Sequence, residues 1–351
     1  MAKEKKEEKA QDFSAQYKGK PYQRIVGIDV ANSTIKTWTD GDVCQVYRNT
    51  VKTINDAGLV YSFKTDYHMF VFNKEVYEVG DISVLGSGGR GKARYNSANF
   101  KTEAVIGITK ILGHASGEKI RVVTGVPSSL AKNAAVVSEM KRNLIGTYDV
   151  KSVIWDKVDT VQFEVVDVIV VPQPLGTIYN YVYDKQKGEL NQALIKQRIL
   201  VVDIGWGTTD LAILESAQVR GTLGFEIGTS DFIAAVQEET NTKIPEANIY
   251  ALNPHELDLA LIQSYNVETP FGVFNLEAIC ERHKKLQAEN IYKSVMGIGT
   301  EYNKFNKIII TGGGALLYEK YLREDFNDPR LIIQEDAVTS NVHGFYLLGK
   351  F

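Results

Sequence analysis

Two aspartates stand at the ends of apolar, strand-like runs, and hydroxyl side chains follow each of them shortly afterwards. Asp29 ends the run VGID and precedes the hydroxyls at 33–34, while Asp203 ends LVVD and precedes those at 208–209. A carboxylate at a strand end can hold a hydrated Mg²⁺, which prefers oxygen ligands and keeps several waters. Backbone and hydroxyl groups of a tight turn can surround an anion. These residue types in this order predict a metal–phosphate site.

The stretch LVVDIGWGTTDLAIL, residues 200–214, carries the stronger of the two signals. Gly205 and Gly207 frame a tight turn around Trp206, and a second apolar strand leaves after Thr209. Glycine lets backbone N–H groups approach an anion closely and allows positive φ angles in the turn. The alternative is a plain β-hairpin, which rarely needs an acid before its turn and two hydroxyls after it.

The stretch RIVGIDVANSTIK, residues 24–36, has the same order of features but carries Ala31 where a loop glycine is expected. Taken alone, it is equally compatible with an ordinary hairpin that has a polar tip. Since alanine disfavours positive φ, we expect Asn32 to take the strained position. The two stretches lie about half a chain apart, so together they suggest two related halves that clamp one ligand.

A third glycine-rich turn, in IIITGGGALL at 308–317, follows a buried strand-like run and precedes a helical one. This order places backbone amides and a helix N-terminus where a nucleotide could pack. A triple glycine by itself is weak evidence, because many strand-to-helix turns use glycine.

The elements that position these turns alternate between strands and helices, which predicts an α/β fold. We expect strands at 24–30, 34–39, 43–49 and 69–79, helices at 101–114 and from about Ser129, and strands at 145–156 and 160–171. The second half repeats the theme, with a helix at 175–184, strands at 198–204, 208–214 and 217–225, helices at 229–239 and 275–296, a strand at 307–311 and a helix from Ala315.

Composition places few limits on function. The 351 residues carry a formal net charge of −3, which disfavours general nucleic-acid binding. The 2 cysteines, Cys44 and Cys280, form no motif, no run reaches membrane-spanning length, and the N-terminus has no apolar signal core. We therefore expect a cytoplasmic protein with a charged, flexible tail over residues 1–22.

Two further patterns are interpreted conservatively. The run GSGGRGKA, residues 86–93, approaches a phosphate-binding P-loop, but Ala93 stands where the magnesium-binding Ser or Thr belongs. We interpret it as an exposed loop. The 5 histidines show no metal-ligand spacing, so we expect them to have surface or core roles.

The combination of these motifs resembles the actin, chaperone and sugar-kinase ATPase superfamily, and within it the ParM and StbA plasmid-segregation actins. The resemblance runs from about residue 24 to the C-terminus and includes VVTGVPSSL, VVPQPLGTIYNY, IGTSDF and NVHGFYLLG. It implies two related α/β domains with ribonuclease H-like cores that flank a nucleotide cleft. Domain I would comprise 23–174 and 338–351, with a small subdomain at about 50–100, and domain II would comprise 175–337.

The resemblance also implies roles for individual residues. Asp29 and Asp203 would hold Mg²⁺ through water, and Gln173 would orient the attacking water, because an amide cannot serve as a general base at neutral pH. The nucleotide, ATP or GTP, would be bound by Ala31, Asn32, Ser33, Thr34, Lys36, Gly205, Trp206, Gly207, Thr208, Thr209, Gly228, Gly312, Gly313 and Gly314.

The function implied is that of a bacterial NTPase that forms dynamic filaments and segregates plasmid DNA. Its partners would be further copies of itself and a ParR-like adaptor on centromeric DNA, with no direct DNA or membrane binding. Three alternatives remain open. A small-molecule kinase of this fold would need an acid where Gln173 stands, a chaperone-like ATPase would need a peptide-binding domain, and a chromosomal cell-shape actin commonly carries an amphipathic membrane segment.

Overall fold

The computed structural model describes residues 21–49, 51–54, 68–79, 92–95, 97–154, 157–216, 218–252 and 254–351. Of the tail expected at 1–22, only the last two residues fall within these ranges. Of the P-loop-like run 86–93, only residues 92–93 do so, at the start of a short helix. These two predictions otherwise lie outside the described residues.

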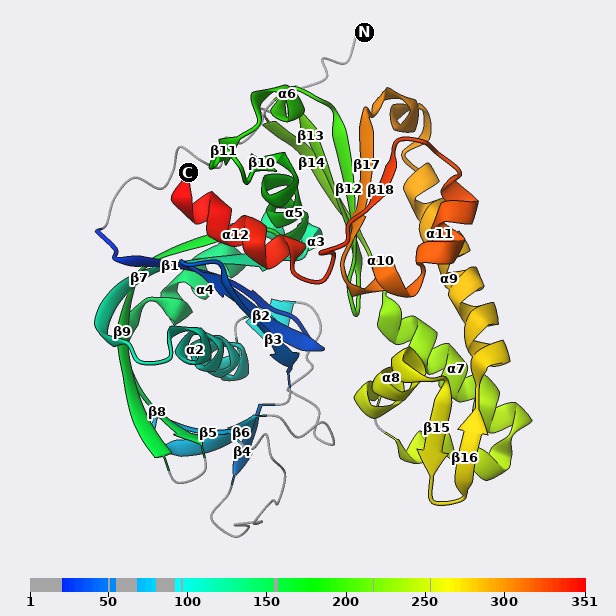
Figure 1. The fold of residues 1–351 in the computed structure, drawn as a ribbon, viewed down its shortest axis with the longest axis horizontal. Helices are drawn as coiled ribbons and strands as arrows, with labels where there is room; N and C mark the ends of the chain where they lie inside the picture. The colour runs from blue at the N-terminus through cyan, green and yellow to red at the C-terminus, as the bar shows by residue number, and fades with distance from the viewer. Residues whose placement is uncertain are drawn as a thin grey trace, which may run out of the picture.

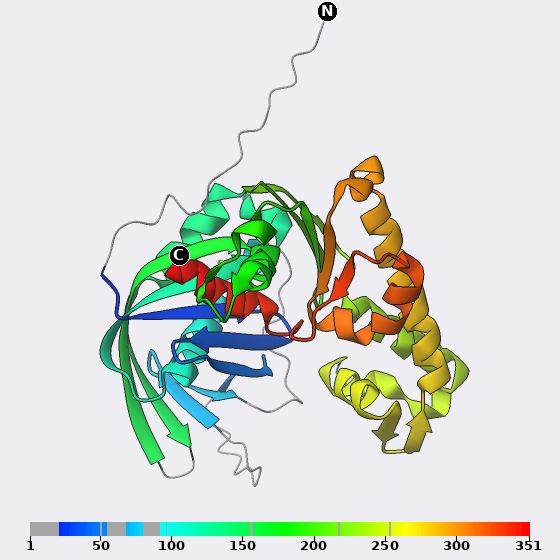
Figure 2. The same ribbon diagram turned by 45° about the horizontal axis from the view of Figure 1, so that its top comes forward.

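Two main β-sheets organise the described chain, and each contains one of the aspartate-bearing hairpins (Figures 1 and 2). Within the described residues the first sheet has nine strands in the order β3-β2-β1-β7-β9-β8-β5-β6-β4, and the second has five in the order β14-β13-β12-β17-β18. The strands of the first sheet are β1 Arg24–Val30, β2 Thr34–Thr39, β3 Val43–Arg48, β4 Lys52–Ile54, β5 His68–Phe72, β6 Glu75–Val79, β7 Ser116–Val126, β8 Gly146–Ile154 and β9 Lys157–Pro172. Those of the second are β12 Ile199–Ile204, β13 Thr209–Glu215, β14 Gln218–Phe225, β17 Lys307–Thr311 and β18 Leu331–Ile333.

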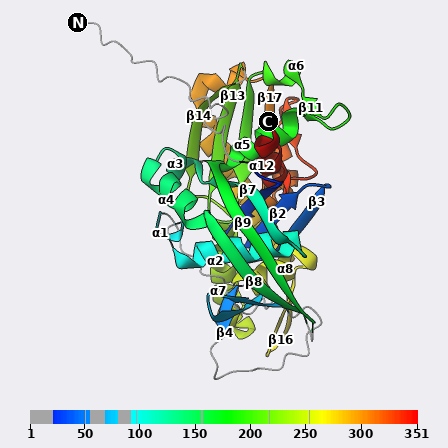
Figure 3. The same ribbon diagram turned by 90° about the vertical axis from the view of Figure 1, so that its left-hand side faces the viewer.

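Helices cover both faces of each sheet, so the apolar core divides into three clusters. The outer face of the first sheet packs against α2 Ala98–Leu112 and α4 Ala134–Leu144. The outer face of the second packs against α7 Thr229–Lys243, α9 Glu277–Met296 and α11 Glu319–Phe326. Between the two sheets lie α5 Gln173–Val182 and α12 Ser340–Lys350, side by side in Figures 1 and 3.

The strand β12 shows how the sequence specifies this layering. Its side chains alternate between the two faces of the sheet, as a strand requires. Leu200 and Val202 point into the outer cluster with α7 and α9, while Ile199 and Val201 point into the central cluster with α5 and α12. Both faces are therefore apolar, and the strand appears in the sequence as an unbroken apolar run.

Several elements differ from the sequence expectations for local reasons. The helix expected from about Ser129 is two helices, α3 Ser128–Ala131 and α4, because the Asn133 side chain accepts a hydrogen bond from Val136 N and starts a new helix. The strand expected at 69–79 is a hairpin, because Asn73 and Lys74 both adopt positive φ, at 53° and 68°.

Other short elements were not predicted from the sequence, apart from α10, which covers the start of the helix expected from Ala315. The region that follows α7 forms a helical and hairpin layer whose local patterns are too weak to assign. The remaining elements are α1 Lys92–Tyr95, α6 Gln192–Ile195, α8 Pro254–Gln263, α10 Gly313–Leu317, the strands β10 Tyr183–Asp184, β11 Glu189–Leu190, β15 Asn266–Thr269 and β16 Gly272–Asn275, and the 3₁₀ turns Pro245–Ala247, Ile249–Ala251 and Gly299–Lys304.

Within the described ranges, no helix combines the length and apolarity needed to cross a bilayer. Both cysteines, Cys44 and Cys280, are free thiols.

Candidate functional site

A cleft of about 980 Å³ lies between the two sheets and is lined from both sides. This volume is in the range typical of small-molecule and cofactor sites. Most of the residues expected from the sequence line its wall: Asp29, Ala31, Asn32, Ser33, Thr34, Lys36, Gln173, Asp203, Gly205, Trp206, Gly207, Thr208, Gly312 and Gly313.

The β1–β2 hairpin brings a carboxylate and an amine together at the floor of the cleft. Asp29 and Lys36 are direct cross-strand partners, and Lys36 Nζ lies 2.9 Å from Asp29 Oδ2. The Asp29 side chain is buried, and the Lys36 side chain is 12% exposed. Burial alone lowers the pKa of Lys36, but the carboxylates of Asp29 and Asp203 outweigh it and raise that pKa above its ordinary value. Lys36 is therefore a fixed cation at the junction of the two hairpins.

The β12–β13 hairpin places Asp203 in the equivalent position, but its cross-strand partner is another carboxylate, Asp210. Burial raises the pKa of Asp203 to about 7, although a hydrogen bond from Asn341 Nδ2 at 2.6 Å opposes this shift. The two hairpins thus have the same register and a different charge balance.

The turns of the two hairpins close with the same backbone hydrogen bond. Ala31 N donates to Thr34 O at 3.0 Å, and Gly205 N donates to Thr208 O at 2.8 Å. None of Ala31, Asn32, Gly205 and Gly207 adopts a positive φ. The expectation that Asn32 takes a strained position is therefore wrong. The expectation that Gly205 and Gly207 are needed for positive φ angles in the second turn is also wrong. Alanine fits at position 31 because the turn does not need the left-handed region.

Two side chains outside the hairpin hold the first turn in place. Asn49 N donates to Ser33 O at 3.0 Å, and Asn49 Nδ2 donates to Ala31 O at 2.8 Å. The buried Arg94, paired with Glu103 at 2.9 Å, donates to Ala31 O at 3.2 Å. The carbonyl of Ala31 is consequently held by two donors from outside the hairpin, which fixes the backbone of the first turn.

The third glycine turn uses its glycines in different ways. Gly312 has φ of 84°, and a Cβ there would overlap the backbone of Ile204. Only glycine meets both conditions. At Gly313 a Cβ would meet nothing within 4 Å, so its backbone borders open space in the cleft.

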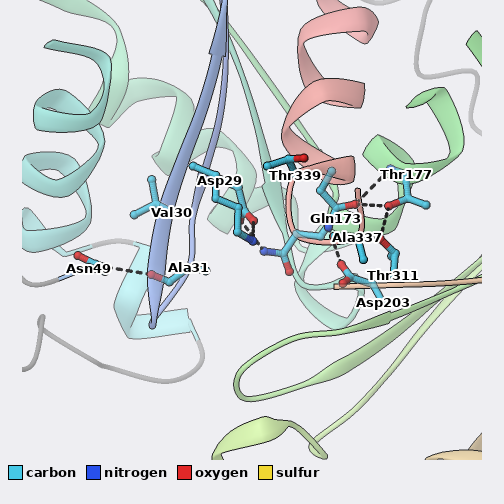
Figure 4. A network of polar contacts seen from close by, with 12 residues as sticks. Asp29, Val30, Ala31, Asn49, Gln173, Thr177, Asp203, Thr311, Ala337 and Thr339 are labelled. Atoms are coloured by element: carbon cyan, nitrogen blue, oxygen red, sulfur yellow. Dashed lines mark hydrogen bonds and ion pairs between the residues drawn. The ribbon is translucent and has the colours of Figure 1, made fainter. Parts of the chain in front are cut away.

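Gln173 is the first residue of α5 rather than the last of a strand, and its side chain crosses to the first hairpin. Its Nε2 donates to Asp29 Oδ1 at 3.2 Å. Figure 4 shows Gln173 between Asp29 and Asp203. An amide here can orient a water molecule but cannot remove its proton at neutral pH.

Three expected residues lie behind the cleft wall and do not line it. Thr209 is buried and its hydroxyl donates to Ile227 O at 2.7 Å. Gly228 packs against the backbone of Trp206, and Gly314 packs against the side chain of Ile204, each leaving no room for a Cβ. In this structure all three residues pack within the walls of the cleft.

The carboxylates present fit a hydrated magnesium ion. Asp29 and Asp203 are 2% and 6% exposed, and one lysine faces the two negative charges. Mg²⁺ is commonly held by one or two carboxylates together with water and phosphate oxygens, so no larger ligand cluster is needed. The described part of the chain contains no group of three or more His, Cys, Asp or Glu side chains placed to bind a metal.

Two family models match the chain, one on each side of the cleft. The model described as actin like proteins, N terminal domain, matches residues 27–176. The model described as archaeal actin homologue MreB-like, C-terminal, matches residues 201–324. The chain belongs to the actin-like proteins. No curated protein matches the sequence.

Solved structures show that this actin-like protein has the whole fold of its relatives. A 15-stranded ParM filament from Clostridium botulinum aligns with a TM-score of 0.75 at 19% identity, covering 94% of this chain and 99% of that one. An archaeal actin homolog in complex with ADP aligns with a TM-score of 0.74 at 16% identity, covering 93% and 99%. The apo psk41 ParM protein aligns with a TM-score of 0.65 at 20% identity, covering 93% and 97%.

Several residues of the actin-like site were not anticipated. Asp210 lies within the motif VVDIGWGTTD, yet its role is structural: Oδ1 accepts a hydrogen bond from Ser128 N at 2.7 Å, across the cleft. Asn341 lies in the quoted segment NVHGFYLLG, but nothing in its spacing indicates that it reaches Asp203. Arg48 and Asp258 form an ion pair across the cleft, and no sequence pattern connects two residues so far apart.

Proposed function

We propose that this actin-like protein binds a nucleoside triphosphate, ATP or GTP, with Mg²⁺ in the cleft and hydrolyses it. The observation that carries the proposal is that two matching acid-tipped hairpins, one from each sheet, meet in a single cleft with Gln173 between them. A ligand with several phosphates and a bound cation can contact the turns and the aspartates of both hairpins at once. We assign residues 23–174 and 338–351 to domain I, and residues 175–337 to domain II.

In this proposal each group of residues has one task. The first turn, with Ser33 and Thr34, and the second, with Gly207 and Thr208, receive the phosphates from opposite sides. Lys36 supplies a positive charge, and Asp29 and Asp203 hold the hydrated Mg²⁺, which neutralises charge on the phosphates. Gln173 orients the attacking water; because its Nε2 donates to Asp29, its carbonyl oxygen is left to accept from that water.

We propose further that nucleotide binding closes the cleft and favours head-to-tail assembly into filaments. A head-to-tail contact of this kind is heterologous and generates an open polymer when the rotation does not close a ring. The ParM relative from Clostridium botulinum is a filament, and this supports the same behaviour here. Hydrolysis then weakens the lattice, which makes the polymer dynamic.

The cellular role that we propose is plasmid segregation in the bacterial cytoplasm. A ParR-like adaptor bound to centromeric DNA links the filament to its cargo, while the net charge of −3 argues against direct DNA binding by this chain. Deletion of the gene from an unstable replicon tests this role, with the frequency of replicon loss as the measurement. We expect the replicon to be lost after the deletion and to be retained again when the intact gene alone is restored. A small basic protein encoded directly downstream is the expected adaptor.

The biochemical proposal is tested by pelleting and phosphate release. The protein is incubated with Mg-ATP, Mg-GTP or the same nucleotides in EDTA, and polymer and free phosphate are measured. We expect polymer and phosphate release with at least one Mg-nucleotide and neither in EDTA. Absence of nucleotide binding overturns the cleft assignment. Binding and hydrolysis without polymer at any practical protein concentration would contradict the filament proposal and favour a kinase-like enzyme, which phosphorylation of a sugar or acid would reveal.

A further inference from the structure

One buried amide, Asn341, contacts the Asp203 carboxylate, and both residues line the cleft. Asn341 is the second residue of α12 and is 6% exposed. Its Nδ2 donates to Asp203 Oδ2 at 2.6 Å. The other oxygen, Asp203 Oδ1, lies against Gly312 at the cleft floor. The hydrogen bond therefore occupies one carboxylate oxygen and leaves the other beside Gly312, a residue of the cleft wall.

The orientation of the Asn341 amide is determined by Thr177 of α5. The backbone N of Thr177 donates to Asn341 Oδ1 at 3.1 Å, and the Thr177 hydroxyl donates to the same oxygen at 2.8 Å. A flipped amide would turn its NH₂ group toward the Thr177 N–H, which can only donate. The end of the amide that faces Asp203 is thus the donating end.

The two helices that hold this contact meet backbone to backbone. A Cβ on Gly176 of α5 or on Gly344 of α12 would overlap the main chain of the other helix. Such a crossing leaves little room for either helix to shift relative to the other. Asn341 is consequently held against α5 by close backbone packing and by the two hydrogen bonds from Thr177.

The same helix α5 begins with Gln173, which donates to Asp29 Oδ1 at 3.2 Å. The crossed pair α5–α12 therefore contacts both aspartates, Asp29 of β1 through Gln173 and Asp203 of β12 through Asn341. We propose that Asn341 is a positioning residue, which orients the Asp203 carboxylate toward the hydrated Mg²⁺ of a bound nucleotide. This inference rests on the nucleotide site proposed above.

The test separates magnesium binding from nucleotide binding. The dissociation rate of a fluorescent ATP or GTP analogue is measured over a series of Mg²⁺ concentrations and in EDTA. For Asn341→Ala we expect the Mg²⁺ concentration that slows dissociation half-maximally to rise about tenfold, because partners of metal ligands typically affect metal affinity on this scale. We expect the dissociation rate in EDTA to change by less than about twofold.

Asn180→Ala is the matched control. Asn180 is also a buried asparagine between α5 and α12. It donates to Asp336 and Ser340 at 2.9 Å each and accepts from His343. None of these partners is Asp29 or Asp203. We expect its Mg²⁺ dependence to equal that of the parent. A shift in Asn341→Ala no larger than in Asn180→Ala overturns the positioning role.

A second variant applies if Asn341→Ala does not fold. Thr177→Val removes the hydroxyl that fixes the amide and leaves Asp203 and Asn341 intact. We expect a smaller rise in the half-maximal Mg²⁺ concentration, and a value equal to that of the parent overturns the inference. The parent protein tests the nucleotide site itself. If the parent binds no nucleotide even with Mg²⁺, the proposed function fails. If the parent binds nucleotide and the variants show the same Mg²⁺ dependence, only the role of Asn341 fails.

Discussion

Arg48 and Asp258 connect the two sides of the cleft through an ion pair of 2.8 Å. Arg48 ends β3 and is the cross-strand partner of Thr34 in the first turn, while Asp258 lies on α8 beyond the second sheet. Burial raises the pKa of Asp258, and the Arg48 guanidinium acts against that shift. The pair thus ties the β1–β2 hairpin of the first sheet to the helical layer outside the second sheet.

Removing this pair should loosen the cleft. For Arg48→Gln we expect the bound nucleotide to dissociate roughly fivefold faster at low salt, equivalent to about 1 kcal/mol for a partly exposed pair. The difference should shrink as salt rises. Arg323→Gln is the control, because it removes an exposed pair with Glu319 far from the cleft. Equal dissociation rates for Arg48→Gln and the parent at low salt would show that the pair does not hold the cleft closed.

Replacing Gln173 with alanine should slow hydrolysis while nucleotide binding is retained. The side chain is positioned by Asp29 and faces the cleft, so its loss removes the orientation of the attacking water. We expect a decrease of about 100-fold in the single-turnover rate, the scale on which misplacement of a reacting group lowers a rate. A single-turnover rate within a factor of about two of the parent would exclude Gln173 from the reaction.

Replacing Asp203 with alanine should abolish Mg²⁺-dependent hydrolysis and leave the fold intact. The carboxylate is buried at the cleft floor, and its removal leaves the strand β12 apolar on both faces. Circular dichroism checks the fold, phosphate release checks activity, and pelleting checks filament lifetime. Phosphate release at the rate of the parent would show that the magnesium assignment is incorrect.

The raised pKa of Asp203 makes a prediction about pH. An unfolded Asp releases its proton near 3.8, whereas the folded group keeps it until about 7, so the folded state loses stability as pH rises between these values. Bound Mg²⁺ competes with that proton. In thermal melts, the stabilisation by Mg-nucleotide over nucleotide in EDTA should therefore be larger at about pH 8 than at about pH 6.

Asp203→Asn provides the comparison for this measurement, since it removes the titrating group and retains a polar side chain of the same shape. Other groups that titrate over the same range contribute equally to both proteins. We expect the pH dependence of the Mg²⁺ effect to be reduced in the variant. An identical pH dependence in parent and variant would assign it to the nucleotide or to another residue.

Two substitutions should show that the small residue at position 31 can be changed at little cost in stability, whereas the glycine at position 314 cannot. Ala31→Gly should lower the free energy of unfolding by no more than about 1 kcal/mol, the entropic cost of glycine. Gly314→Ala should lower it by about 1–3 kcal/mol, because the added Cβ overlaps the Ile204 side chain. Urea denaturation measures both. A larger loss for Ala31→Gly than for Gly314→Ala would mean that the Ala31 methyl group packs in the turn.

The hairpins were predictable because their signals are local. The unbroken apolar run of β12 and the position of Asp203 near its end lie within a few neighbouring residues, and the pairing of Asp29 with Lys36 follows from the strand register. The φ angles of the turn were not predictable. The role of glycine there depends on how the backbone of Gly228 packs against Trp206, which is a tertiary contact.

The contacts that join the two sides of the cleft could not be read from the sequence. Asn341 reaches Asp203, and Arg48 reaches Asp258, only because the chain brings distant elements together. The weakly patterned region after α7 illustrates the same limit, since α8 and the β15–β16 hairpin owe their place to packing against the outer cluster. Periodicity predicts which face of an element is buried, but it does not predict its partner.

The contact of Gly176 with Gly344 also restricts how the protein can move. Because two helices in backbone contact have little room to slide past one another, we expect any change in cleft width to be a rotation about their crossing. Displacement then increases with distance from that point. The ends farthest from it, near β5 and β6 on one side and β15 and β16 on the other in Figure 1, travel most. By this geometry we expect a small rotation at the cleft floor to give a larger displacement at the outer ends of the molecule.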